Sequence, residues 1–212
     1  MKKAVWIVIV VAVVVLLGFL LSSGNSSSVA SNFSISAIST GDHVKGNKDA
    51  KVVLIEYSDF QCPACRSYYP ILRQITQEYG DRIALVYRHF PLKTIHLNAD
   101  FSARASEAAN KQGKFWEMHD LLFEKQTEWE SVSDILPVFS NYAKLLGLDT
   151  VQFEKDFKSN EVKDFVNSQR VSGNTFKVAG TPTFFLNGEK LENPRSIDEF
   201  KKLLNEALSK NK

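Results

Sequence analysis

The sequence predicts an α/β domain with an inserted all-helical segment, preceded by an N-terminal membrane-spanning helix. Three observations lead to this prediction. The chain of 212 residues opens with a long apolar run after two lysines. A strand–helix–strand pattern follows from residue 49 and contains the only two cysteines, spaced Cys-X-X-Cys. A helix-rich stretch without a convincing strand then separates this first half from a closing hairpin and helix.

Residues 1–23 are predicted to be a transmembrane anchor. Ala4 to Leu21 is a run of about 18 apolar residues or glycines, longer than the about 7–15 residues of a signal-peptide core and within the range of membrane-spanning helices. Lys2 and Lys3 predict an inside N-terminus and an outside domain by the positive-inside rule. The alternative is a cleaved signal peptide with a permissible site at Ser28-Val29-Ala30.

In either case the folded domain is expected on the extracytoplasmic side, periplasmic or cell-surface, where disulfides persist. The anchor alternative makes it a single-pass protein of the cell membrane. Residues 24–48 are rich in Ser, Asn and Gly and predict a flexible linker. Without Lys2 and Lys3, 24 of the 26 basic residues remain against 24 acidic ones, so the outer domain is formally neutral. No basic block is present, and nucleic acid is not an expected partner.

The first half of the α/β domain is predicted to span residues 49–97. Lys51 to Ser58 is β-branched and almost continuously apolar, which is typical of a central strand covered on both faces. Helical spacing runs from Pro63 to Tyr79 and ends at Gly80. Arg82 to Arg88 predicts a second strand, and this order implies a parallel pair with a right-handed crossover.

Residues 98–177 are predicted to form the helical insertion. Helical spacing recurs there in five segments, 99–112, 114–124, 134–146, 151–158 and 161–176. Trp129 falls in a polar loop between two of these segments. The other aromatic and aliphatic residues are expected to form the core of the insertion.

Residues 178–212 are predicted to complete the α/β domain. Thr183 to Leu186 is the next strand, and Asn187-Gly188 is a strong two-residue hairpin signal before a short return strand, 189–191. Ser196 can cap a last helix from Ile197 to about Ser209.

The pair Cys62 and Cys65 predicts redox chemistry. A disulfide across two intervening residues closes a small loop, so it stabilises little and exchanges easily. With Cys62 at the N-cap of the helix, free N–H groups and the helix dipole lower the pKa of its thiol. Cys62 is therefore the expected nucleophile, and Cys65 the more buried resolving thiol. Residues 59–61 are expected to shape access to them.

The alternatives for this pair are an inert disulfide or half of a zinc site. A second Cys-X-X-Cys is absent from the sequence, and the four histidines offer no pair three to five residues apart. No metal and no cofactor is therefore expected.

Four segments resemble the DsbA-like thiol–disulfide oxidoreductases: Glu56 to Cys65 (EYSDFQCPAC), His89 to Leu92 (HFPL), Gly113 to Trp116 (GKFW) and Gly180 to Phe185 (GTPTFF). The likeness spans roughly Val44 to Leu208. It implies a thioredoxin-like fold with an inserted all-helical domain, and an enzyme that exchanges dithiols and disulfides. Family members often carry histidine directly before the second cysteine. Ala64 stands there, which leaves the oxidising strength open.

The resemblance also implies supporting residues. The family places a cis-proline beside the cysteines, and Pro182 in Gly180-Thr181-Pro182 matches it. The backbone of Thr181 would then pair with an extended substrate segment. The alternative for Pro182 is an ordinary strand-initiating proline.

An acid six residues before the first cysteine relays a proton in such proteins, and Glu56 has that spacing. Strict alternation places Glu56 on the same strand face as Leu54, so its carboxylate is expected below the site with a raised pKa. The alternatives are an exposed glutamate at the strand end or a purely structural ion pair.

The predicted function is the introduction of disulfides into exported proteins with free thiols. The resemblance implies a quinone-linked membrane oxidase as the reoxidant, since the chain has no further cysteine. A reductase or an isomerase of the same fold is the alternative within this class. Isomerases of this kind usually carry a dimerisation domain, which the linker does not offer. A non-catalytic peptide-binding or holdase module is the alternative of another class.

Overall fold

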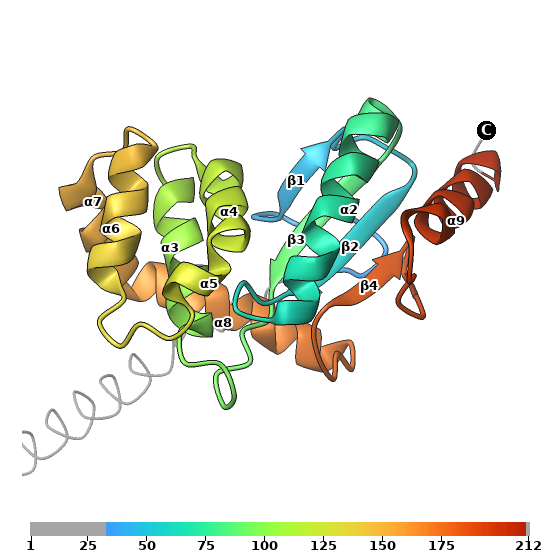
Figure 1. Cartoon of the computed structure of the whole chain (residues 1–212). Coiled ribbons are helices and arrows are strands. Elements are labelled where there is room, and N and C mark those ends of the chain that lie inside the picture. Colours follow the sequence, from blue (N-terminus) through green and yellow to red (C-terminus); the bar gives the residue numbers. More distant parts are fainter. Residues whose placement is uncertain (1–32, 211–212) are drawn as a thin grey trace, which may run out of the picture. The chain divides into compact units, whose positions relative to one another are not determined.

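The computed structural model describes residues 33–210 of the chain (Figure 1). The predicted membrane anchor and the first part of the predicted linker lie outside the described residues. Within residues 33–210, no helix is long and apolar enough to span a bilayer.

Five strands form one sheet in the order β1-β3-β2-β4-β5. Their bounds are His43–Gly46 for β1, Val53–Ser58 for β2, Ala84–His89 for β3, Thr183–Leu186 for β4 and Glu189–Lys190 for β5. β2 and β3 pair in parallel, which confirms the predicted pairing, and the other three pairings are antiparallel. Every residue of β2 and β3 is buried, as expected for central strands between two covered faces.

Apolar clusters lie on both faces of the sheet because alternate residues of a strand point to opposite sides. Leu54 belongs to the cluster that packs α2 (Pro63–Tyr79) and α9 (Ile197–Lys210) on one face. Figure 1 shows α2 crossing in front of β2 and β3. A short 3-10 helix, η1 (Gly80–Arg82), links α2 to β3. Ile55 belongs to the cluster on the opposite face.

The helical insertion lies between β3 and β4. Its helices are α3 (Ala99–Asn110), α4 (Phe115–Glu124), α5 (Gln126–Trp129), α6 (Leu136–Leu145), α7 (Thr150–Lys158) and α8 (Asn160–Thr175). The five predicted helical segments are confirmed. The short helix α5 is not among them. Trp129 at its end is fully buried, and its indole N–H donates to the Leu122 carbonyl at 2.9 Å. This is a tertiary contact, which the local sequence pattern around Trp129 does not show.

The core of the insertion continues into the surroundings of the cysteines. Phe139, Phe153 and Trp129 belong to the same buried cluster as Cys62 and Cys65. The two parts of the fold therefore share packing at this point.

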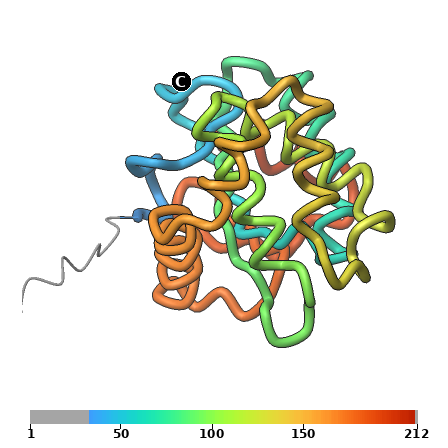
Figure 2. The backbone as a smooth tube through the Cα atoms, turned by 90° about the vertical axis from the view of Figure 1, so that its left-hand side faces the viewer, coloured from blue at the N-terminus to red at the C-terminus, as the bar shows by residue number. Residues whose placement is uncertain are grey.

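Residues 33–48 differ from the prediction of a flexible linker reaching residue 48. β1 forms within this range and pairs with β3. Ile35 and Ile38 pack against the apolar cluster opposite α2. Figure 2 shows the segment entering beside α8, where a Cβ placed on Gly41 would lie only 2.9 Å from the Phe165 ring.

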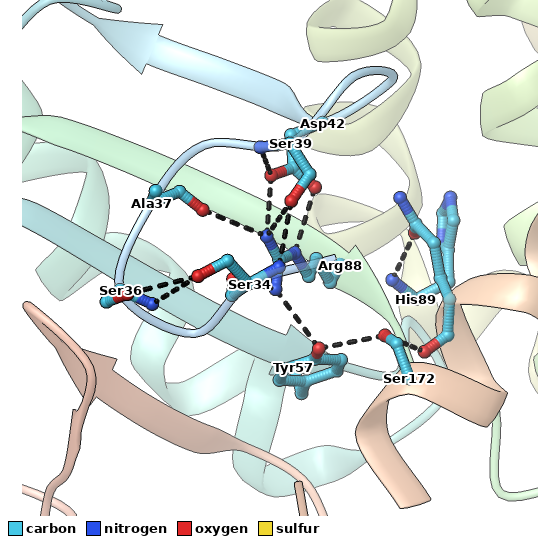
Figure 3. A network of polar contacts seen from close by, with 10 residues as sticks. Ser34, Ser36, Ala37, Ser39, Asp42, Tyr57, Arg88, His89 and Ser172 are labelled. Atoms are coloured by element: carbon cyan, nitrogen blue, oxygen red, sulfur yellow. Dashed lines mark hydrogen bonds and ion pairs between the residues drawn. The ribbon is translucent and has the colours of Figure 1, made fainter. Parts of the chain in front are cut away.

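A buried ion pair fixes this segment to the sheet (Figure 3). The Arg88 guanidinium donates to both carboxylate oxygens of Asp42, at 2.9 and 2.7 Å, and both side chains are fully buried. Arg88 also donates to the Ser34 carbonyl at 2.8 Å and the Tyr57 hydroxyl at 3.2 Å. A buried charge is tolerated when its hydrogen bonds are satisfied, and Arg88 meets this condition. The sequence gives no sign of this ion pair, because Asp42 and Arg88 lie 46 positions apart.

Candidate active site

The two cysteines lie where β2 gives way to α2. Cys62 is the N-cap residue of α2, with extended backbone angles (φ −71°, ψ 122°), and Pro63 occupies the first helical turn. Proline fits there because its missing N–H has no partner in the helix. The Cys62 side chain is 7% exposed and that of Cys65 is fully buried; both are thiols in this structure. The predicted difference in burial is confirmed.

The two thiols have opposite electrostatic surroundings. The hydrogen bond from Cys65 is the main cause that lowers the pKa of Cys62, to about 5, against desolvation by burial. Thr181 and the backbone N–H groups of Cys65 and Ala64 lower this pKa further. Burial raises the pKa of Cys65 well above its ordinary value, and Cys62 and Glu56 add to this shift. One sulfur is thus a ready thiolate and the other holds its proton.

Pro182 lies beside this pair, and the Thr181–Pro182 peptide bond is cis, as predicted. The Cys62 thiol donates to the Thr181 carbonyl at 3.4 Å. The Thr181 hydroxyl is buried without a hydrogen-bond partner, yet Thr181 lowers the pKa of Cys62 through its side chain. This hydroxyl is therefore free to donate to a thiolate at Cys62.

Glu56 lies in the middle of β2 and is only 3% exposed, which excludes the exposed alternative. Burial raises the pKa of its carboxyl to about 7, opposed by a hydrogen bond from the Ser58 hydroxyl at 2.7 Å. Glu56 takes part in none of the ion pairs found among residues 33–210, so the structural ion-pair alternative has no support there. A cleft between α2 and α4 reaches Glu56 and is lined there by Lys45, Trp116 and His119.

One further residue at the site has no signal in the sequence. Gln126 of α5 is 1% exposed, and its amide donates to the carbonyls of Phe60, at 2.6 Å, and Cys62, at 3.2 Å. The insertion thus holds the turn that carries Cys62. A glutamine more than sixty positions along the chain is connected to this turn only by the fold.

A separate buried cluster bears on metal binding. His43, His89 and Glu107 place one ligand atom each within 4.8 Å of one another. One Glu107 oxygen lies 2.6 Å from the His43 ring and 2.7 Å from the His89 ring. These are hydrogen-bond distances, which join β1, the end of β3 and α3. The absence of a bound metal stays a prediction.

Comparison with known proteins agrees with this geometry. A family model described as thioredoxin matches residues 39–206. The probable disulfide bond formation protein D of Bacillus cereus is 34% identical over 174 residues, which are 78% of each chain. The crystal structure of alpha-DsbA1 from Wolbachia pipientis superposes with a TM-score of 0.73 at 20% identity, covering 82% of this chain and 94% of that one, and shows the shared fold.

A larger protein also contains a related region. The Na(+)/H(+) antiporter NhaA 3 of Salinispora tropica is 38% identical over 157 residues, 74% of this chain. The chain spans only 23% of the length of that antiporter. The matched family model, the relative aligned over most of both chains and the shared fold together show that this chain belongs to the thioredoxin family, as one of its DsbA-like thiol–disulfide oxidoreductases.

Proposed function

We propose that this protein is an extracytoplasmic oxidase that introduces disulfides into exported proteins through Cys62 and Cys65. The observation that carries the proposal is the inequality of the two thiols: the pKa of Cys62 is lowered to about 5, and that of Cys65 is raised well above its ordinary value. A disulfide between such thiols has one sulfur suited to be attacked and to leave again as a thiolate.

The reaction proceeds by two thiol exchanges. A substrate thiolate attacks the Cys62 sulfur of the Cys62–Cys65 disulfide, which forms a mixed disulfide and releases Cys65 as a thiolate that takes up a proton. The second substrate thiolate then attacks the substrate sulfur of the mixed disulfide, and Cys62 leaves as a thiolate. The substrate loses two electrons and two protons and gains a disulfide, while the reduced enzyme keeps one proton on Cys65, leaves Cys62 as a thiolate and releases the other proton to water.

The thiolate at Cys62 favours this direction because it stabilises the reduced enzyme. At pH 7 the pH lies two units above a Cys62 pKa of about 5, which stabilises the reduced form by about 3 kcal/mol. In a two-electron couple this raises the reduction potential by at most about 60 mV. Screening by solvent at the mouth of the site reduces the figure.

Glu56 is the proposed proton relay for Cys65. With a pKa of about 7 it can give up and take back a proton near neutral pH. The ionisation of Glu56 and that of Cys65 are coupled: a charged Glu56 raises the pKa of the Cys65 thiol and so disfavours a thiolate there. A neutral Glu56 therefore eases the departure of Cys65, and its proton then completes the step.

The proposed location is based on the N-terminal sequence, and the proposed partners are based on the activity. The apolar run of residues 4–21 supports a membrane anchor on residues 1–23, followed by a tether and by the domain outside the membrane. The proposed domain consists of the halves 49–97 and 178–212 with the insertion 98–177, and the described segment that carries β1 packs onto it. Exported proteins with free thiols are the proposed substrates. A quinone-linked membrane oxidase is the proposed acceptor of the two electrons, because the chain offers no further cysteine.

The direction is tested by equilibrating the protein with glutathione buffers and reading the Cys62–Cys65 redox state by alkylation and mass spectrometry. We expect a potential clearly above that of thioredoxin, about −270 mV. A potential at or below this value would make the protein a reductase.

Trapping experiments test the substrate class. A Cys65→Ser variant lacks the resolving thiol and should accumulate mixed disulfides with exported proteins, whereas Cys62→Ser should accumulate none. Undiminished client binding and unchanged disulfide formation with Cys62→Ser would indicate a holdase instead.

A further inference from the structure

The loop between β3 and α3 is fastened to the turn that precedes α2. The Asp59 carboxylate accepts the backbone N–H of Leu92 at 3.0 Å and contacts Nδ1 of His96 at 2.7 Å. The backbone N–H of Asn98 donates to the Gln61 side chain at 2.5 Å. His96 is thereby held beside the catalytic turn from a segment more than thirty residues away in sequence.

Asp59 brings a buried negative charge to this turn. Its side chain is fully buried, its carboxylate accepts the N–H of Gln61 at 2.8 Å, and its carbonyl accepts the N–H of Cys62 at 3.0 Å. We expect a carboxylate on the residue whose carbonyl accepts the Cys62 N–H to oppose a thiolate on Cys62, because like charges repel at short range. Pro63 and Ala64 provide no compensating charge between the cysteines. Among the described residues, His96 is the ion-pair partner of Asp59.

We propose that His96 is a positioning residue for thiol exchange at Cys62: its imidazolium neutralises the Asp59 carboxylate and so favours the thiolate form of Cys62. The inference rests on the proposed function in that Cys62 is the attacked sulfur. It is independent of whether the enzyme oxidises or reduces its substrates. His96 thus provides, from the neighbouring loop, the positive charge that the Cys-Pro-Ala-Cys motif lacks.

The other charged groups around His96 agree with an imidazolium. The hydrogen bond with Asp59 is the main cause that raises the pKa of His96, against desolvation by burial, and Cys62 and Glu130 raise it further. On the same loop, Lys93 forms an ion pair with Asp100 of α3. Cys62 itself faces the thiol of Cys65, and its charge acts on Glu56.

The sign of the effect follows from the charge of the pair. With His96 protonated, the pair with Asp59 is neutral and leaves the Cys62 thiolate undisturbed. As the pH rises through the pKa of His96, the pair gains a net negative charge and disfavours that thiolate. The imidazolium and the thiolate therefore stabilise each other.

Variants of the pair give opposite shifts. In His96→Gln the Asp59 charge stays uncompensated, so the pKa of Cys62 should rise by about 0.5–1 unit. In Asp59→Asn the carboxylate is gone and the pKa of Cys62 should fall, while the double variant should lie near the wild type. The pKa is read from the pH dependence of the iodoacetamide reaction at Cys62. Lys93→Gln is the matched control, an exposed charge on the same loop that should leave the value unchanged.

Shifts of the same sign in both single variants, or no shift in a folded His96→Gln, would overturn the inference. Reaction at Cys65 before Cys62 would instead contradict the proposed function. A second measurement needs no variant: the pKa of His96, followed by NMR, should be higher in the dithiol than in the disulfide, because the thiolate disappears on oxidation. Equal values in the two states would also overturn it.

Discussion

Replacing Glu56 with glutamine should increase the stability of the reduced protein at alkaline pH and leave it little changed at acidic pH. The folded protein raises the pKa of this carboxyl from 4.5 to about 7, mainly through burial. An acid with a raised pKa contributes stability below its unfolded value, and this contribution is lost as the pH rises through the folded value. Ionised Glu56 therefore lowers the free energy of unfolding above pH 7.

The size of the effect follows from the shift. Two and a half pKa units at 1.36 kcal/mol each amount to about 3 kcal/mol, reached almost entirely between pH 4.5 and 7. Glutamine keeps the shape and an oxygen that accepts the Ser58 hydroxyl. At pH 8 we therefore expect Glu56→Gln to exceed the wild type in free energy of unfolding by about 3 kcal/mol, and at pH 4 by less than about 1 kcal/mol.

Urea denaturation of the reduced proteins at a series of pH values measures this difference. Glu206→Gln, an exposed position on α9, is the matched control and should show no pH-dependent difference from the wild type. A stability difference between Glu56→Gln and the wild type that is the same at pH 4 and pH 8 would refute a buried, proton-holding Glu56.

Three further outcomes are expected. Thr181→Val removes the buried hydroxyl that is free to donate to a thiolate at Cys62 and should raise the pKa of the Cys62 thiol, which slows alkylation at pH 6; an unchanged rate would contradict this role. Arg88→Met strands the buried Asp42 carboxylate and should lower the free energy of unfolding by about 3–5 kcal/mol; a loss below about 1 kcal/mol would show residues 33–42 to be dispensable. The purified protein should contain no stoichiometric metal, and its melting temperature should not respond to EDTA; a marked drop would indicate an ion in the buried histidine–glutamate cluster.

Much of the fold could be predicted from local patterns. The continuous apolar runs of β2 and β3, the helical spacing after Pro63 and the Asn187-Gly188 turn each have a short-range physical cause. The N-cap position of Cys62 and the burial of Glu56 could be predicted for the same reason. Both follow from where a strand ends and from which face a residue takes.

The contacts that could not be predicted join distant parts of the chain. β1 is a four-residue edge strand in a polar stretch, and its place depends on pairing with β3. Gln126 and His96 act on the catalytic turn only because the insertion and the loop after β3 fold back onto it. Neither residue belongs to a periodic pattern or a motif, so only the three-dimensional arrangement shows what they contact.

The pH dependence of alkylation at each cysteine of the reduced wild-type protein, resolved by mass spectrometry, tests the central claim most directly. The structure predicts that Cys62 titrates with a pKa of about 5 and that Cys65 stays unreactive to well above pH 9. Two cysteines that titrate together near pH 9, or a Cys65 that reacts first, would contradict the assignment of Cys62 as the attacked sulfur.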